Sequence, residues 1–281
     1  MKKFTLALPL LALSSLYSYA NDAILNVEGS IQINGRTVIN SDGQWAAYTT
    51  EIEVDCSENK SALRDKFDQG YSNLRISAGD CYAPRWYEEL SVTFIGATDA
   101  AEGLVSISRM PEDPYDYDGD ILDASSLLDV GIGAFLYIRG VNIVDNTLSE
   151  TGYSTVNGEL NSTIYLRDVS VTTNQAECIF GEGNSLYLRD STLSGCSSTA
   201  IRAENNANIK MKRSTISDGE IALGLISTLA GSDNTISNVD LHLSENSYAV
   251  FENEITSIGS VVCYDNSVAR SWSGEGVNYC Q

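Results

Sequence analysis

Three stretches of the chain repeat one pattern: FLYIRGVNIVD (135–145), TIYLRDVSVTT (163–173) and SLYLRDSTLSG (185–195). Each contains an apolar residue, a tyrosine, an apolar residue and an arginine, followed by a glycine or an aspartate. Apolar and polar side chains therefore alternate with a period of two, which is typical of a β-strand with one buried face. The repetition indicates that the chain builds the same short strand several times.

The repeats continue along the chain at spacings of 22 to 28 residues. In our alignment, the position after the arginine is occupied successively by Gly140, Asp168, Asp190, Arg213 and Asn238. A second phrase interleaves with the first at 178–183, 200–205 and 222–227, which is a period of 22 residues. Such short strands cannot bury their apolar face alone, so a fixed period of this length predicts the stacked coils of a solenoid. It disfavours an antiparallel sandwich, which short strands alone would also allow.

The region from about Cys56 to the C-terminus resembles a right-handed parallel β-helix of the pectate-lyase-like class. The stretch SALRDKFDQGYSNLRISAGDCY (61–82) is similar to the usual opening of such domains, a short capping helix followed by a first strand. Ser57 or Asn59 is a candidate helix cap, and the apolar face of the helix is expected to carry Ala62, Leu63 and Phe67. The expected fold is all-β, a parallel β-helix solenoid with a short N-terminal capping helix and an N-terminal β-strand segment.

Three segments are expected along the chain. Residues 1–20 have the features of a secretory signal peptide: Lys2 and Lys3 precede a short apolar run that ends in Ser18-Tyr19-Ala20. The alternative, a membrane helix, would need a longer apolar run. Residues 21–55 form the N-terminal β segment, and residues 56–281 form the β-helix. We therefore expect an exported protein that is periplasmic, extracellular or at the cell surface, with no transmembrane segment.

The six cysteines fall into three local pairs near the start, middle and end of the chain. An even count in an exported chain favours disulfides. A zinc site is disfavoured because no CxxC occurs and His242 is the single histidine. The predicted pairs are Cys56–Cys81, Cys178–Cys196 and Cys263–Cys280.

The formal net charge is −21, which excludes nucleic-acid binding through a general positive field. Against this background, the outward positions of the repeated strand gather rings and cations. This set, called the strip, consists of Tyr137, Arg139, Tyr165, Arg167, Tyr187, Arg189, Lys210 and Lys212. Stacked cations repel each other, so the strip needs an explanation. One hypothesis is that these long side chains only cover a flat sheet, with repulsion eased by nearby acids. The other is a platform on which rings stack on sugars and cations bind their acidic groups.

Catalytic signals are weak. The resemblance implies that polysaccharide lyases and hydrolases are candidate classes, but the motifs of the polygalacturonase-like and pectate-lyase branches are absent. A lyase could still use a Tyr or Lys base with Arg139, Arg167 or Arg189 neutralising the uronate. His242 is expected at an outward strand position, where a structural role is favoured over catalysis.

The acidic loop PEDPYDYDGDILD (111–123) is a candidate calcium site, with no other cofactor expected. Its carboxylates surround Gly119 and match the hard oxygen donors that calcium prefers. The spacing departs from the EF-hand loop, so a plain acidic surface loop is the alternative. The candidate ligands are Asp116, Asp118, Asp120 and Asp123.

Three functions follow from the sequence. The first is binding of an extracellular or cell-surface polysaccharide, of acidic type, through the strip. The second is a polysaccharide lyase acting on a uronate-containing glycan. The third is a non-catalytic structural surface or matrix protein, in which the strip only covers the sheet.

Overall fold

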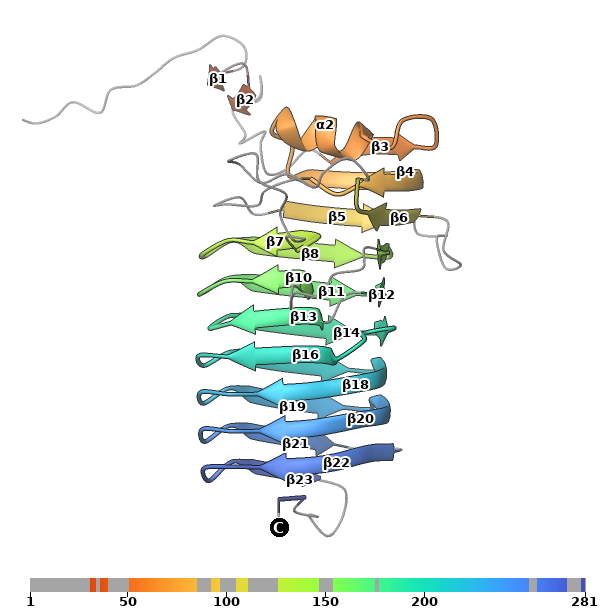
Figure 1. The fold of residues 1–281 in the computed structure, drawn as a ribbon. Coiled ribbons are helices and arrows are strands. Elements are labelled where there is room, and N and C mark those ends of the chain that lie inside the picture. The colour runs from red at the N-terminus through yellow and green to blue at the C-terminus, as the bar shows by residue number, and fades with distance from the viewer. Residues whose placement is uncertain are drawn as a thin grey trace, which may run out of the picture.

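The computed structural model describes residues 31–33, 36–39, 51–84, 92–96, 105–110, 126–146, 154–174, 177–252, 257–271 and 279–280. The expected signal peptide and the candidate calcium loop at 111–123 lie outside these residues. From β3 onward the strands form one sheet of 21 strands, in which the strand pairings are parallel. The protein is therefore a parallel β-solenoid, as the sequence predicted, and its coils stack along one axis (Figure 1).

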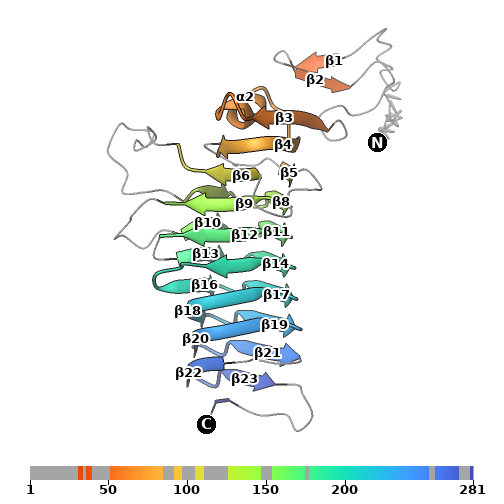
Figure 2. The same ribbon diagram turned by 90° about the vertical axis from the view of Figure 1, so that its right-hand side faces the viewer.

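Three strand columns form the three faces of the solenoid. The first face contains β3 (Ile52–Cys56), the first half of β4 (Asn73–Tyr82), β5 (Val92–Gly96), β8 (Phe135–Arg139), β11 (Thr163–Arg167), β14 (Ser185–Arg189), β17 (Asn208–Lys212), β19 (Thr228–Ser232), β21 (Tyr248–Glu252) and β23 (Val268–Ser271). The second contains the end of β4, β6 (Val105–Ser108), β9 (Asn142–Asp145), β12 (Ser170–Thr173), β15 (Thr192–Ser194) and the first halves of β18 (Thr215–Leu223) and β20 (Thr235–Leu243). Figure 2 shows this face toward the viewer.

The third face contains β7 (Leu128–Val130), β10 (Ser154–Gly158), β13 (Glu177–Glu182), β16 (Thr199–Glu204), the second halves of β18 and β20, and β22 (Ser257–Cys263). Side chains alternate between the interior and the surface along the strands of the first face, whereas β10, β13 and β16 of the third face each begin with three buried residues. The inward side chains of the three faces form one continuous apolar core. On the first face, Leu186 and Leu188 point inward and Tyr187 and Arg189 outward, and Leu193 points inward after the corner. These orientations are those predicted from the repeated phrase.

A helix closes the N-terminal end of the solenoid. Leu63 and Phe67 of α2 (Ala62–Asp68) are buried against the first coil, and Ala62 is partly buried beside them. Neither predicted cap residue is correct: the N-cap is Ser61, and the Asn59 side chain accepts a hydrogen bond from the Ser61 N–H at 3.0 Å. The helix thus covers apolar edges that would otherwise be exposed.

The first strand of the solenoid begins earlier than expected. β3 pairs with β4 from Ile52, so the sheet includes residues that the sequence analysis assigned to the N-terminal segment before residue 56. The N-terminal segment itself contributes a separate antiparallel pair, β1 (Ile31–Ile33) and β2 (Arg36–Ile39). All three predicted disulfides are present, with Cα–Cα distances of 5.3, 5.4 and 5.6 Å.

The predicted fixed period of 22 residues is wrong. Stacked hydrogen-bond partners are 28 residues apart at Asp129/Asn157, 22 at Val169/Ser191, 23 at Ser191/Ser214 and 20 at Ser214/Asn234. Coils shorten because β18 and β20 run directly from the second face to the third, whereas an irregular segment separates β15 from β16. This shift moves every later residue to a new position in the stack.

The predicted corner residue after Arg213 is therefore wrong. Asp233, and not Asn238, follows Arg213 at the corner between the first and second faces, because Lys212 pairs with Ser232. Asn238 lies at the next corner and donates a hydrogen bond to Asp218 at 3.3 Å. On the third face, Ile221 stacks on Ile201, which stacks on Ile179. The predicted second phrase at 222–227 is therefore displaced by two residues from the observed register.

A buried polar ladder follows the first corner, which the sequence alignment did not reveal. The Val169 N–H donates to Ser191 Oγ, the Ser191 N–H to Ser214 Oγ, and the Ser214 N–H to Asn234 Oδ1 at 2.9 Å. All three polar side chains are buried. Because a buried unpaired N–H is costly, this ladder replaces sheet hydrogen bonds where the strand bends.

The turn at Leu225-Ile226 generates a stability prediction. Both residues have a left-handed backbone (φ 49° and 65°), although the stacked turns have Asn205-Asn206 and Glu245-Asn246 there. A β-branched residue pays about 1–2 kcal/mol for this conformation, and asparagine tolerates it. We expect Ile226→Asn to raise the free energy of unfolding by about 1 kcal/mol in chemical denaturation.

Ile132→Asn is the matched control. Ile132 is also an exposed isoleucine in a turn, but it does not have a positive φ. Equal gains from the two substitutions would show that lost surface apolarity, and not backbone conformation, is responsible.

Candidate functional site

The strip lies along the first face, where the sequence placed it. Tyr165 pairs in register with Tyr137 on one side and Tyr187 on the other, and Arg167 pairs likewise with Arg139 and Arg189. The next strand continues the two columns with Lys210 and Lys212. In-register parallel pairing stacks equivalent side chains about 4.8 Å apart, so all eight predicted residues form two adjacent columns.

The tyrosines stack on each other. Their ring centroids lie 5.4 Å apart between Tyr137 and Tyr165 and 5.5 Å apart between Tyr165 and Tyr187, with interplanar angles of 28° and 22°. Lys210 Nζ lies 5.5 Å from the centroid of the Tyr187 ring. Both faces of the Tyr165 ring are thus occupied by neighbouring rings, so the column presents ring edges and hydroxyl groups to solvent.

The arginines of the strip are paired with aspartates at the corner. Asp168 Oδ2 lies 3.6 Å from Arg139 Nε and 3.4 Å from Arg167 Nε, and Asp190 Oδ2 lies 3.3 Å from Arg189 Nε. The corner requires a left-handed residue (φ 53° at Asp168, 52° at Asp190), which aspartate tolerates. The same residues therefore bend the chain and neutralise the cations beside them.

Arg213 strengthens this network from the next corner. Its guanidinium binds both carboxylate oxygens of Asp190, at 2.6 and 2.7 Å. The hydrogen bonds from Arg213, with a smaller contribution from Arg189, lower the pKa of the Asp190 carboxyl from its ordinary value of 3.8. The column of basic residues is stable here because the carboxylates of Asp168 and Asp190 lie beside it at the corner.

The two lysines differ from the arginines. Neither Lys210 nor Lys212 forms an ion pair within the described part of the chain, and both are exposed. Beside them, the next strand carries only small residues, Ala230, Gly231 and Ser232. Two cations that form no ion pair therefore lie beside a stretch of the face that carries only short side chains.

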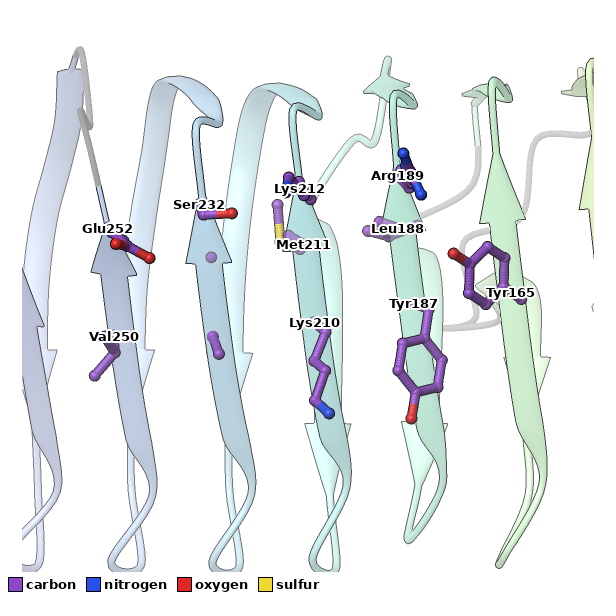
Figure 3. Close-up of a pocket in the computed structure, with 12 residues that line it drawn as sticks. Tyr165, Tyr187, Leu188, Arg189, Lys210, Met211, Lys212, Ser232, Val250 and Glu252 are labelled. Carbon is purple, nitrogen blue, oxygen red and sulfur yellow. The ribbon is translucent and has the colours of Figure 1, made fainter.

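This step in side-chain size creates a groove of about 370 Å³ on the first face. Figure 3 shows Lys210 and Lys212 on one side of β19 and Val250 and Glu252 on the other. The lining residues are Tyr165, Tyr187, Leu188, Arg189, Lys210, Met211, Lys212, Ala230, Gly231, Ser232, Val250 and Glu252. The groove thus gathers five residues of the strip, whereas Tyr137, Arg139 and Arg167 continue the strip away from it.

Sequence reasoning missed half of this groove. Ser232, Val250 and Glu252 belong to the columns of the strip only if the coils shorten to 20 residues after Lys212. The sequence alignment put Asn238, 25 residues after Arg213, at the next corner and therefore placed them out of phase. The available signal was the repeat of Thr215-Ile216-Ser217 at Thr235-Ile236-Ser237, which has the shorter spacing.

The remaining candidates lie elsewhere. His242 is exposed on the third face, as predicted, with Nδ1 3.1 Å from Glu220 Oε1 and its ring 5.4 Å from that of Tyr264. It takes no part in the groove. Within the described ranges, no three His, Cys, Asp or Glu side chains form a group that could hold a metal ion. The calcium hypothesis concerns Asp116, Asp118, Asp120 and Asp123, which lie outside those ranges.

Comparison with known proteins gives a fold-level likeness only. No protein-family model and no curated protein matches the chain. Among solved structures, WceF of Pantoea stewartii is similar, with 10% identity and a TM-score of 0.45; it is described as a glycan biofilm modifying enzyme with a bacteriophage tailspike-like parallel beta-helix fold. The alignment covers 89% of this chain and 43% of that chain, so the chain spans less than half of that protein. In the described part of the chain, no helix has the length and apolarity to cross a membrane.

The corner network generates a pH prediction. Because folding lowers the pKa of Asp190, its stabilising effect is present above the ordinary carboxyl pKa and is lost as the pH falls through the lowered value. We expect Asp190→Asn, which keeps a side chain suited to the left-handed corner, to lower the melting temperature by about 2 °C at pH 7. The difference should shrink as the pH approaches 2.

Asp265→Asn serves as the control, since Asp265 also has a left-handed backbone (φ 50°) but no ion pair with a described cation. It should leave the melting temperature nearly unchanged at both pH values. A loss at Asp190→Asn that is independent of pH would contradict a role for its charge.

Proposed function

We propose that the protein is exported and binds an acidic extracellular or cell-surface polysaccharide through the strip and the groove at its end. The observation that carries the proposal is the pair of unpaired cations, Lys210 and Lys212, beside the groove. Other cations of the first face, such as Arg139, Arg167 and Arg189, are held by corner aspartates. The lysines are thus the cations without an ion pair that line the groove.

The charge of the whole protein makes this local arrangement significant. With a formal net charge of −21, the protein repels polyanions over most of its surface. An anionic polymer can therefore approach closely only where cations are locally concentrated and unneutralised. The groove with Lys210, Lys212 and Arg189 along one side is such a place, and lysine binds acidic groups as a flexible point charge.

The shape of the first face supports an extended ligand. Its strands stack in register along a straight axis, so the strip offers a linear surface and not an enclosed pocket (Figure 1). Tyrosine hydroxyl groups along it can donate and accept hydrogen bonds with sugar hydroxyls. Because the ring faces are covered by neighbouring rings, sugars are expected to contact ring edges and hydroxyls rather than lie flat on the rings. Three disulfides suit an oxidising, extracytoplasmic location.

The groove supports binding better than hydrolysis. Glu252 is the one carboxylate among its lining residues, whereas glycoside hydrolysis in most families uses a pair. A lyase reaction would require a Tyr or Lys base at the groove, and it is tested by the same experiment. A purely structural protein would bind no glycan at all.

Replacing both lysines tests the proposal. Binding of hyaluronan, polygalacturonate and dextran sulfate is measured by biolayer interferometry at low and physiological salt. For each polymer that the wild-type protein binds, we expect Lys210→Gln/Lys212→Gln to raise the Kd at least about tenfold, because two charge-assisted contacts are lost. Absorbance of unsaturated products, recorded on the same mixtures, would reveal lyase activity.

Lys60→Gln/Lys66→Gln is the matched control, with the same change of net charge at the far, N-terminal end of the solenoid. Lys66, like Lys210, lies over a tyrosine ring, at 5.8 Å from Tyr71. Equal weakening by the two double variants would indicate a general charge effect. If none of these polymers binds to the wild-type protein, the proposal is wrong.

A further inference from the structure

The groove has charges of opposite sign on its two sides. Lys212 on β17 and Glu252 on β21 occupy the same column, and Ser232 on β19 separates them. Two strand spacings place their backbones about 10 Å apart. Both side chains are exposed, and neither forms an ion pair or hydrogen bond with a described residue.

This arrangement contrasts with the rest of the first face. Along the strip, opposite charges are adjacent and neutralise each other, as Arg167 and Asp168 do at 3.4 Å. At the groove, a cation and a carboxylate face the same space without meeting. Arg270, one strand beyond Val250 in the neighbouring column, also forms no ion pair with Glu252. The free charges are therefore complementary to a ligand that carries both signs.

The floor between the charged sides is short and mostly apolar. Ala230 lies between Lys210 and Val250, and the buried Gly231 beside it lies between Met211 and Phe251, so nothing larger than a methyl group projects outward from this part of β19. A sugar ring seated over Ala230 would contact apolar surface beneath it. Its substituents would then reach toward the lysines on one side and toward Glu252 on the other (Figure 3).

We propose that the groove selects a zwitterionic polysaccharide, one whose repeating unit carries an acidic group and, on a nearby sugar, a free amino group. The acidic group binds Lys210 and Lys212, and the ammonium group binds Glu252. A uniformly anionic polymer also meets the lysines but is repelled by Glu252, so charge pattern, and not total charge, sets the preference. This inference rests on the proposed function and specifies its ligand.

The test compares one polymer in two forms. Hyaluronan carries a carboxylate on alternate sugars and an N-acetyl group on the others, and N-deacetylation converts the latter to ammonium groups. We expect the wild-type protein to bind partially N-deacetylated hyaluronan about three- to fivefold more tightly than hyaluronan of the same length. Glu252→Gln should remove this preference, by weakening binding of the deacetylated form and strengthening binding of the parent.

Glu245→Gln is the control, because Glu245 is an exposed acid in a turn of the same coil that does not line the groove. It lowers the negative charge of the protein equally and should leave the preference intact. A preference that survives Glu252→Gln, or that is lost equally with Glu245→Gln, would overturn the inference.

The two proposals fail in different ways. If both forms of hyaluronan bind, and binding depends on Lys210 and Lys212 but not on the charge of Glu252, the polysaccharide function stands and the zwitterionic specificity is wrong. If neither form of hyaluronan binds to the wild-type protein, the zwitterionic specificity is wrong, and the polysaccharide function is also wrong if polygalacturonate and dextran sulfate do not bind either.

Discussion

In-register parallel pairing is the constraint on which the rest of this structure depends. Each strand of the first face places its residues directly above their equivalents in the preceding coil, about 4.8 Å away. A side chain therefore has neighbours of the same type whenever the sequence repeats. That condition makes aromatic stacks, buried hydrogen-bond ladders and columns of like charge unavoidable consequences of repetition, and each must be stable for the coil to form.

The columns of the first face show how the protein meets this condition. Three tyrosines gain from offset ring contact, and three arginines would repel without the corner aspartates. Asp168 and Asp190 are suited to the left-handed corner, and their carboxylates lie within reach of the arginine column. The architecture thus explains much of the strip without a ligand. What remains for function is narrower and lies at the end of the strip, where Lys210, Lys212 and Glu252 form no ion pair with any residue that the structure describes.

Much of the fold could be predicted because alternation and repetition are local properties. The strand faces, the helix over the N-terminal coil and the three disulfide pairs all follow from spacing and residue type. The phase of the later coils could not be predicted from a fixed period, because the irregular segment that separates β15 from β16 has no counterpart in β18 and β20. An error of two residues at Ala222 and a wrong corner residue at Asn238 followed from that loss.

The sequence alone therefore determined that this is a parallel solenoid with a basic, aromatic strip on an acidic protein, since a period of two and a recurring phrase specify which side chains are outward. Only the tertiary structure decided which of those side chains are free. Whether a cation is neutralised depends on acids from other coils: Arg213 and Asp190 are 23 residues apart in sequence and hydrogen-bonded in space. The groove is likewise a product of stacking, because the small residues of β19 form a hollow only between the longer side chains of β17 and β21.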